Sequence, residues 1–157
     1  MATFTPDGYQ TATPYLIVRD APKAVAFYKD VFGAVELFRL TDPSGRVVHV
    51  DIKVGDSPIM VVEETPAWGN FSPESPQGGA SGRIHLHVAD AESVCSRAVA
   101  AGAKQLIPVA DQFYGQRGGR LQDPFGHIWT IATHKETLSE EEMNRRFHEF
   151  LKKLQTK

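Results

Sequence analysis

The sequence predicts an α+β fold, in which two tandem βαβββ modules form a curved mixed sheet or cup and a helix follows them. Two observations support this prediction: a short motif occurs twice, and the same order of helix and strands follows each copy. Val18-Arg19-Asp20-Ala21 recurs as Val88-Ala89-Asp90-Ala91, 70 residues further along the chain. Because each copy stands between a strand-like and a helical stretch, the repeated unit is a whole βαβββ module.

Each copy of the motif predicts a helix with defined ends. Asp20 and Asp90 are placed as N-caps, where a carboxylate accepts a hydrogen bond from a backbone N–H of the first turn. Apolar residues then recur at helical spacing until Gly33 in the first helix and Gly102 in the second. A glycine at this position is typical of a left-handed helix end.

Short segments of strand character flank these helices. The predicted strands are Tyr15–Val18, Val35–Leu40, Val47–Val54 and Ile59–Val62 in the first module, and Ile84–Val88, Gln105–Val109, Gln116–Gln122 and Ile128–Thr133 in the second. We therefore expect one domain over residues 1–137, with module one at about 13–63, a linker at 64–82 and module two at about 83–134. Pro, Gly and Ser enrich the linker, which predicts a mobile segment or lid.

The last segment, residues 138–157, is predicted to be an amphipathic helix. Ser139-Glu140-Glu141-Glu142 is typical of a capping box, which opens a helix. One apolar face follows, made by Met143, Phe147, Phe150, Leu151 and Leu154. That face must cover either the domain itself or a second subunit, and we expect a homodimer.

Composition limits the classes of partner. The formal charge of −2 and the lack of a basic stripe argue against nucleic acid or a membrane surface as partner. Cys95 is the single cysteine, which excludes an intrachain disulfide and fits the cytoplasm; we expect it in the core or at the edge of the core rather than as a nucleophile. No apolar run reaches the roughly 18 residues of a membrane helix.

Side-chain alternation turns the repeat into a hypothesis about a site. Ile84, Leu86 and Val88 share one face of their strand and should pack on helices, so His85 and His87 share the other face. Tyr15 is the counterpart of His85 at the repeat distance. His49 is expected on the same concave surface as these residues, as is Thr130 on the last strand.

One long motif links the chain to a known family. Phe113-Tyr114-Gly115-Gln116-Arg117, followed by Asp123-Pro124-Phe125-Gly126-His127-Ile128-Trp129, resembles the glyoxalase / bleomycin-resistance / extradiol dioxygenase (vicinal oxygen chelate) superfamily. The resemblance covers about residues 13–134, and the motif is similar to the glyoxalase-like branch related to phosphonate-operon proteins. In the metal enzymes of this superfamily, the residue seven places after the aspartate is a ligating glutamate, and here it is Thr130.

The resemblance implies four metal-ligand positions on the first, fourth, fifth and eighth strands. These positions correspond to Thr13, a residue near Glu63, Arg83 and Thr130, of which only Glu63 is a suitable ligand. A shift of two residues along each strand keeps the side chains on the same face of the sheet. It replaces Arg83 by His85 and Thr13 by Tyr15, and His49 or His87 would complete a different set of metal ligands.

Two functions from different classes follow. The first is a small-molecule binding protein with no metal and no other cofactor. Its stacking surfaces would be Tyr15, Trp68, Phe113 and Tyr114, and its polar anchors His85, His87 and Arg117. Arg117 fits a solvent-side salt bridge equally well, and Trp68 fits an interface anchor. The alternative is a metal-dependent lyase, isomerase or dioxygenase that uses Zn, Ni, Mn or Fe, with Glu63 or a histidine as proton shuttle.

Overall fold

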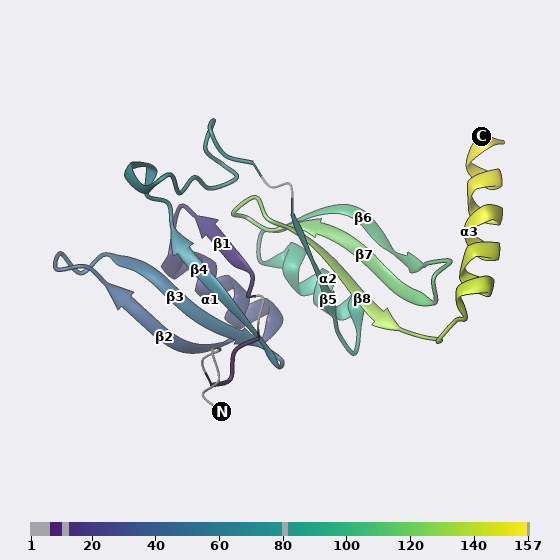
Figure 1. Cartoon of the computed structure of the whole chain (residues 1–157), viewed down its shortest axis with the longest axis horizontal. Helices are drawn as coiled ribbons and strands as arrows, with labels where there is room; N and C mark the ends of the chain where they lie inside the picture. Colours follow the sequence, from purple (N-terminus) through teal and green to yellow (C-terminus); the bar gives the residue numbers. More distant parts are fainter. Residues whose placement is uncertain (1–6, 11–12, 80–81, 157) are drawn as a thin grey trace, which may run out of the picture. The chain divides into compact units, whose positions relative to one another are not determined.

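The computed structural model describes residues 7–10, 13–79 and 82–156 (Figure 1). The elements run in the order β1 (Tyr15–Val18), α1 (Ala21–Phe32), β2 (Val35–Thr41), β3 (Val47–Val54), β4 (Ser57–Glu63), the 3-10 turn η1 (Pro66–Trp68), β5 (Arg83–His87), α2 (Ala91–Ala100), β6 (Lys104–Asp111), β7 (Gln116–Gln122), β8 (Ile128–His134) and α3 (Glu140–Gln155). The chain divides into two compact units. The first holds the elements up to η1 together with the turn Asp123–His127, and the second holds the other elements.

Both units are built on the same four-stranded mixed sheet. The strand order is β1-β4-β3-β2 in the first and β5-β8-β7-β6 in the second. The first strand of each module runs parallel to its fourth, and the other neighbours are antiparallel. The α+β prediction with two βαβββ modules and a final helix is confirmed, whereas the predicted division into one domain and a separate C-terminal segment stays a prediction.

One helix packs on one face of each sheet. The Asp20 side chain accepts from Lys23 N at 3.1 Å, and the Asp90 side chain accepts from Ser93 N at 3.1 Å. Gly33 ends α1 with φ 65°, in the left-handed region that the sequence predicted. These caps have local causes, which explains why the motif alone located both helices.

The core of each unit lies between its helix and its sheet. The largest fully buried side chains include Trp129, Tyr28, Ile52, Leu121 and Ile131. Cys95 is also buried, as predicted, and burial raises the pKa of its thiol. The other face of each sheet is not covered by its own helix, and we call it the open face.

The Asp123–His127 turn completes the core of the first unit. Asp123 Oδ1 accepts from the backbone N–H of Phe125 at 2.9 Å and of His127 at 3.0 Å, while Tyr28 Oη donates to Oδ2 at 2.7 Å. His127 Nε2 lies 2.9 Å from the carbonyl oxygen of Ile17. His127 therefore has a structural role.

The segment predicted as a mobile linker has local structure over much of its length. Ser72 is fully buried, and its hydroxyl donates to Glu64 at 2.9 Å. Pro73 lies against Gly126, since a Cβ placed on Gly126 would come within 2.8 Å of the Pro73 ring. Composition does not report these contacts, and the mobility that it predicts for this segment stays a prediction.

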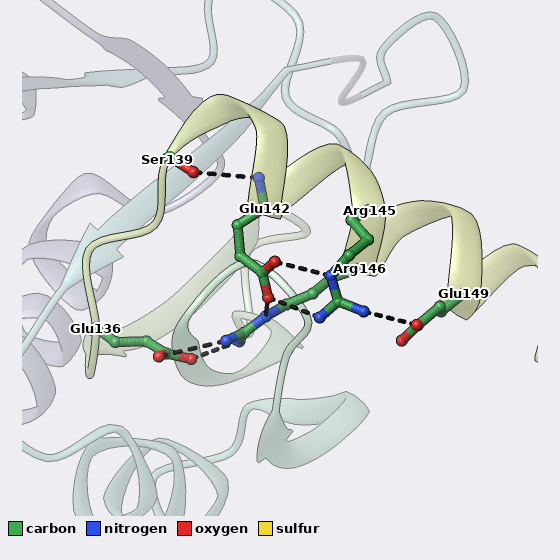
Figure 2. Close-up of polar contacts among 6 residues, drawn as sticks. All are labelled: Glu136, Ser139, Glu142, Arg145, Arg146 and Glu149. Atoms are coloured by element: carbon green, nitrogen blue, oxygen red, sulfur yellow. Dashed lines mark hydrogen bonds and ion pairs between the residues drawn. The ribbon is translucent and has the colours of Figure 1, made fainter.

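The final helix α3 begins where the sequence predicted. The Ser139 hydroxyl accepts from Glu142 N at 3.2 Å, so half of the predicted capping box is formed (Figure 2). No helix among the described residues is long and apolar enough to cross a membrane.

Candidate functional site

The open face of the second sheet gathers polar side chains from three strands. In the β5–β8 register Arg83 pairs with Ile128, His85 with Thr130, and His87 with Ala132. Residues of β5 alternate between exposed and half-buried, with both histidines on the exposed side. The predicted facing of His85, His87 and Thr130 therefore agrees with the register.

The two histidines form one hydrogen-bonded group with Gln116 of β7. Their ring centroids are 4.6 Å apart. His85 Nε2 lies 3.0 Å from Gln116 Oε1, and Gln116 Nε2 lies 3.3 Å from His87 Nε2. With the amide in this orientation, His85 donates from Nε2 and His87 accepts at Nε2.

A small hollow lies beside this group. It has a volume of about 70 Å³, and its lining is Ile107, Gln112, Tyr114, Gly118, Gly119, Arg120 and Thr130. Arg120 Nε is buried and has no hydrogen-bond partner among the residues that the structure describes. Arg120 and Thr130 are direct partners in the β7–β8 register, so both side chains come from adjacent strands at the same level.

The two glycines of this hollow keep the strands close together. A Cβ on Gly118 would lie 2.7 Å from the carbonyl oxygen of Ile131, and one on Gly119 would lie 2.8 Å from that of Ile107. Both contacts are with backbone, which cannot rotate away. The floor of the hollow therefore requires glycine at both positions.

The open face of the first sheet is different, because it is mainly apolar and aromatic. Tyr15 is half-exposed, and its ring lies 6.2 Å from that of His49, which is also 6.4 Å from Phe38. His49 Nε2 contacts Asp51 Oδ1 at 2.6 Å, while Tyr9 donates to the other carboxylate oxygen. The hydrogen bond from Tyr9 to Asp51 is the main reason that the pKa of Tyr9 is raised to about 12.

Glu63 lies on the helix-covered face of its sheet, and its assignment as a ligand-binding residue stays a prediction. Its carboxylate accepts from Ala21 N at 2.7 Å, at the start of α1. Burial raises the pKa of this carboxyl above its usual range, although the Ala21 N–H acts in the opposite direction. In the second module, Thr133 Oγ1 accepts from Ala91 N at 2.9 Å in the same way. Glu63 and Thr133 are 70 residues apart, as are the two copies of the motif, so the two side chains have the same structural role in their modules.

Arg117 also faces away from the open side. Its guanidinium contacts Glu92 of α2 at 2.8 Å and Asp111 of β6 at 3.3 Å. Of the two roles that the sequence left open for Arg117, the salt bridge is therefore the one observed.

The three remaining aromatic candidates lie in different surroundings. Trp68 is 73% exposed, more than the other large apolar residues that the structure describes. Phe113 packs on α3, with ring centroids 5.4 Å from Phe147 and 5.2 Å from Phe150. Tyr114 contacts Phe113 edge-on and also lines the Arg120 hollow.

The donor set does not fit the divalent metal that the resemblance implies. Of the four implied positions, Thr13 precedes β1, Glu63 caps α1, and Arg83 carries a positive charge. Thr130 offers a neutral hydroxyl. A shift of two residues replaces Thr13 by Tyr15 and Arg83 by His85, and of these only His85 is a good metal ligand. Their partners on the adjacent strands, Met60 and Thr130, add no further strong ligand. Among the described residues, no three His, Cys, Asp or Glu side chains are grouped as a metal would require.

Sequence reasoning missed Arg120, although a signal for it was present. A tight turn at Asp123–Gly126 joins β7 to β8, so the two strands pair about that turn. Thr130 was already expected on the open face, and counting back across the turn places Arg120 opposite it. Tyr9 and Asp51 had no comparable signal, because their contact depends on the path of the N-terminal segment.

Comparison with known proteins agrees with this fold. Residues 8–131 match the model of the Glyoxalase/Bleomycin resistance protein/Dioxygenase superfamily. The chain belongs to this superfamily. The Mycobacterium tuberculosis protein Rv0887c (strain H37Rv), whose function is uncharacterised, is 35% identical to it over 122 residues, 76% of this chain and 72% of that protein.

Solved structures of the superfamily fold are also similar. TioX from Micromonospora sp. ML1 has a TM-score of 0.62 and 26% identity, covering 78% of this chain and 98% of that one. The Arabidopsis thaliana gene product At5g48480 has a TM-score of 0.62 and 28% identity, covering 79% and 98%. The fosfomycin resistance protein FosX from Listeria monocytogenes, solved with Mn(II) and sulfate, has a TM-score of 0.62 and covers 88% and 98%. Its identity of 18% shows the fold alone.

Proposed function

We propose that this superfamily member binds a small anionic molecule on the open face of its second sheet, and that it does so without a divalent metal. The observation that carries the proposal is the Arg120 side chain, which lines the hollow and whose buried Nε has no hydrogen-bond partner among the described residues. A guanidinium stays charged at all physiological pH values, and leaving one of its donors buried and unsatisfied costs free energy. A carboxylate, phosphate or sulfate group in the hollow would pair with this guanidinium.

The surrounding face supports an anion rather than a cation. Arg83, His85 and His87 stand on β5, which β8 separates from β7, and the Thr130 hydroxyl on β8 is a neutral donor at the level of Arg120. None of the residues on the open side of β5, β7 and β8 is an aspartate or a glutamate. A face that carries the two arginines Arg83 and Arg120 and no carboxylate favours anions and disfavours divalent metal ions.

The size of the hollow limits what part of the ligand it holds. At about 70 Å³ it fits one small oxyanion group and not a whole aromatic ring system. Tyr114 at its edge would then contact the apolar part of the ligand. Tyr15, His49 and Trp68 stay candidate ligand contacts on the first unit.

The test is anion binding measured in the presence of a chelator. Inorganic phosphate, sulfate and acetate would be titrated into protein in EDTA, with binding followed by amide NMR shifts. Arg120→Gln should weaken binding by about 10- to 100-fold, the range expected when a hydrogen bond to a charged group is lost. Arg117→Gln is the matched control, because it removes an arginine from the other face of the same strand and should leave affinity unchanged. Equal affinity of Arg120→Gln and wild type would refute the site.

Metal content separates this proposal from the enzyme alternative. One specific observation favours that alternative, namely that Asp51 holds His49 by one ring nitrogen, an arrangement that suits a proton acceptor. In that alternative the proton shuttle would be His49 rather than Glu63, because the Glu63 carboxylate accepts from Ala21 N at the start of α1. Mass spectrometry of protein purified without an affinity tag or chelator would decide: near-stoichiometric Zn, Ni, Mn or Fe per chain would contradict the metal-free proposal.

A further inference from the structure

We propose that α3 pairs antiparallel with α3 of a second copy of this chain. The inference is independent of the proposed anion site. It rests on three features of the helix: a continuous apolar stripe that its own unit covers only in part, a hollow beside that stripe, and unpaired charges of opposite sign at its two ends.

The apolar stripe runs the length of the helix. Met143, Phe147, Phe150 and Leu154 are spaced by four, three and four residues, which is the spacing of a two-helix seam. Their side chains are 37–55% exposed, and Leu154 is the most exposed of them. Within its own unit the stripe meets Phe113, which contacts Phe147 and Phe150. More than a third of each apolar side chain therefore still faces solvent.

A hollow opens beside the C-terminal half of the stripe. Phe150, Lys153, Leu154 and Thr156 line it, and its volume is about 420 Å³. Such a space accepts apolar side chains from a facing helix. In the pairing that we propose, Met143 and Phe147 of the second copy would enter it.

Charges in the middle of α3 are already satisfied within the chain. Figure 2 shows Glu142 between Arg145 and Arg146, with Arg145 reaching Glu149 and Arg146 reaching Glu136. The two arginines hold the pKa of Glu142 at about 2. These groups need no partner from another molecule.

The charges at the two ends of α3 are not satisfied. Glu140 and Glu141 in the first turn and Lys152 and Lys153 in the last turn have no ion-pair partner among the described residues. A parallel pair of helices would bring glutamates beside glutamates and lysines beside lysines. An antiparallel pair brings each acidic end beside a basic end and also opposes the two helix dipoles.

The same arrangement gives a consistent register. When Phe147 faces Phe150 of the second copy, Met143 faces Leu154 of that copy, and each contact occurs twice by symmetry. The 16 residues of α3 span about 24 Å, enough for four such layers. The stripe and the end charges thus select one orientation.

The first test is the association state of the full chain. Sedimentation velocity from about 1 μM to about 1 mM should show a monomer–dimer equilibrium. Leu154→Glu should raise the dissociation constant by about 100-fold, because one exposed leucine per copy is lost from the seam. Val99→Glu is the control, since Val99 is a similarly exposed apolar residue on α2. A monomer at all concentrations, or a dimer that Leu154→Glu leaves intact, would overturn the proposal.

Disulfide trapping tests the orientation. Cys95 is buried, so a cysteine introduced on α3 is the reactive one. Met143→Cys and Leu154→Cys proteins, mixed in a glutathione buffer, should form the mixed disulfide in preference to either homodimer. A predominant Met143→Cys homodimer would indicate parallel helices and refute the antiparallel pairing.

Discussion

The last strand of each module carries a side chain that accepts a hydrogen bond from the first residue of the module's helix. In the second module this side chain is Thr133, so removal of one hydroxyl group tests the role of the contact. Thr133 Oγ1 accepts from the backbone N–H of Ala91 at 2.9 Å, at the first residue of α2. Replacing Thr133 by valine keeps the branched shape and removes only the acceptor. The Ala91 N–H then has no acceptor, because the Asp90 side chain already accepts from Ser93 N.

The expected cost follows from the burial of this site. Ala91 is 2% exposed, so water cannot replace the lost hydroxyl. An unsatisfied buried donor costs about 1–3 kcal/mol, and loss of a helix cap typically costs about 1 kcal/mol. We expect Thr133→Val to lower the free energy of unfolding by about 1.5 kcal/mol and the melting temperature by about 4 °C.

The control for this test is three residues away on the same strand. Thr130 lies on the open face, and no hydrogen bond of its hydroxyl is found among the described residues, so Thr130→Val should change stability by less than about 0.5 kcal/mol. Urea unfolding of both variants, followed by circular dichroism, gives the two free energies at constant slope. Thr133→Ser should recover part of the loss. Equal effects of the two valine variants would refute the capping role.

Three further predictions concern buried groups. Tyr28→Phe should destabilise the chain by about 2 kcal/mol in urea unfolding, because its hydroxyl donates at 2.7 Å to the buried Asp123 carboxylate. The raised pKa of Glu63 means that the folded state binds its proton more tightly than the unfolded state does. Its contribution to stability is therefore full below the unfolded pKa of about 4.3 and is lost as pH rises through the folded value. The difference in unfolding free energy between wild type and Glu63→Gln should fall over that window, and a pH-independent difference would contradict the burial of this group. Gly118→Ala should cost about 2 kcal/mol in a thermal melt because its Cβ would press on backbone, whereas Gly79→Ala, with no atom within 4 Å of a Cβ, should be nearly neutral.

The order of elements could be predicted from the sequence because its causes are local. Side-chain period, the capping aspartates and the glycine at the end of α1 each act within a few residues, and the strands Tyr15–Val18, Val47–Val54 and Gln116–Gln122 were predicted with the bounds that the structure has. Membership of the superfamily was also predicted, from the Asp-Pro-Phe-Gly turn and the segment around it.

The assignment of side chains to a face was less complete. Alternation divides each strand into two sets, and it placed His85 and His87 correctly because Ile84 and Leu86 are apolar. It gave no such guide for Glu63, where the family position was carried over, and the structure turns that carboxylate to the start of α1. The repeat offered a guide to this position, because Thr133 lies 70 residues after Glu63 and contacts the start of α2 in the same way.

The sequence by itself determined the two modules, their helices and strands, the caps and the apolar stripe of α3, since each of these is written in neighbouring residues. Only the tertiary structure decided the surroundings of the two arginines of β7: it buries Arg120 Nε and pairs Arg117 with Glu92 and Asp111. It also brought Tyr9 to Asp51 and Phe113 to α3, contacts between residues distant in the sequence. Such contacts form when whole elements pack together, and no local pattern records them.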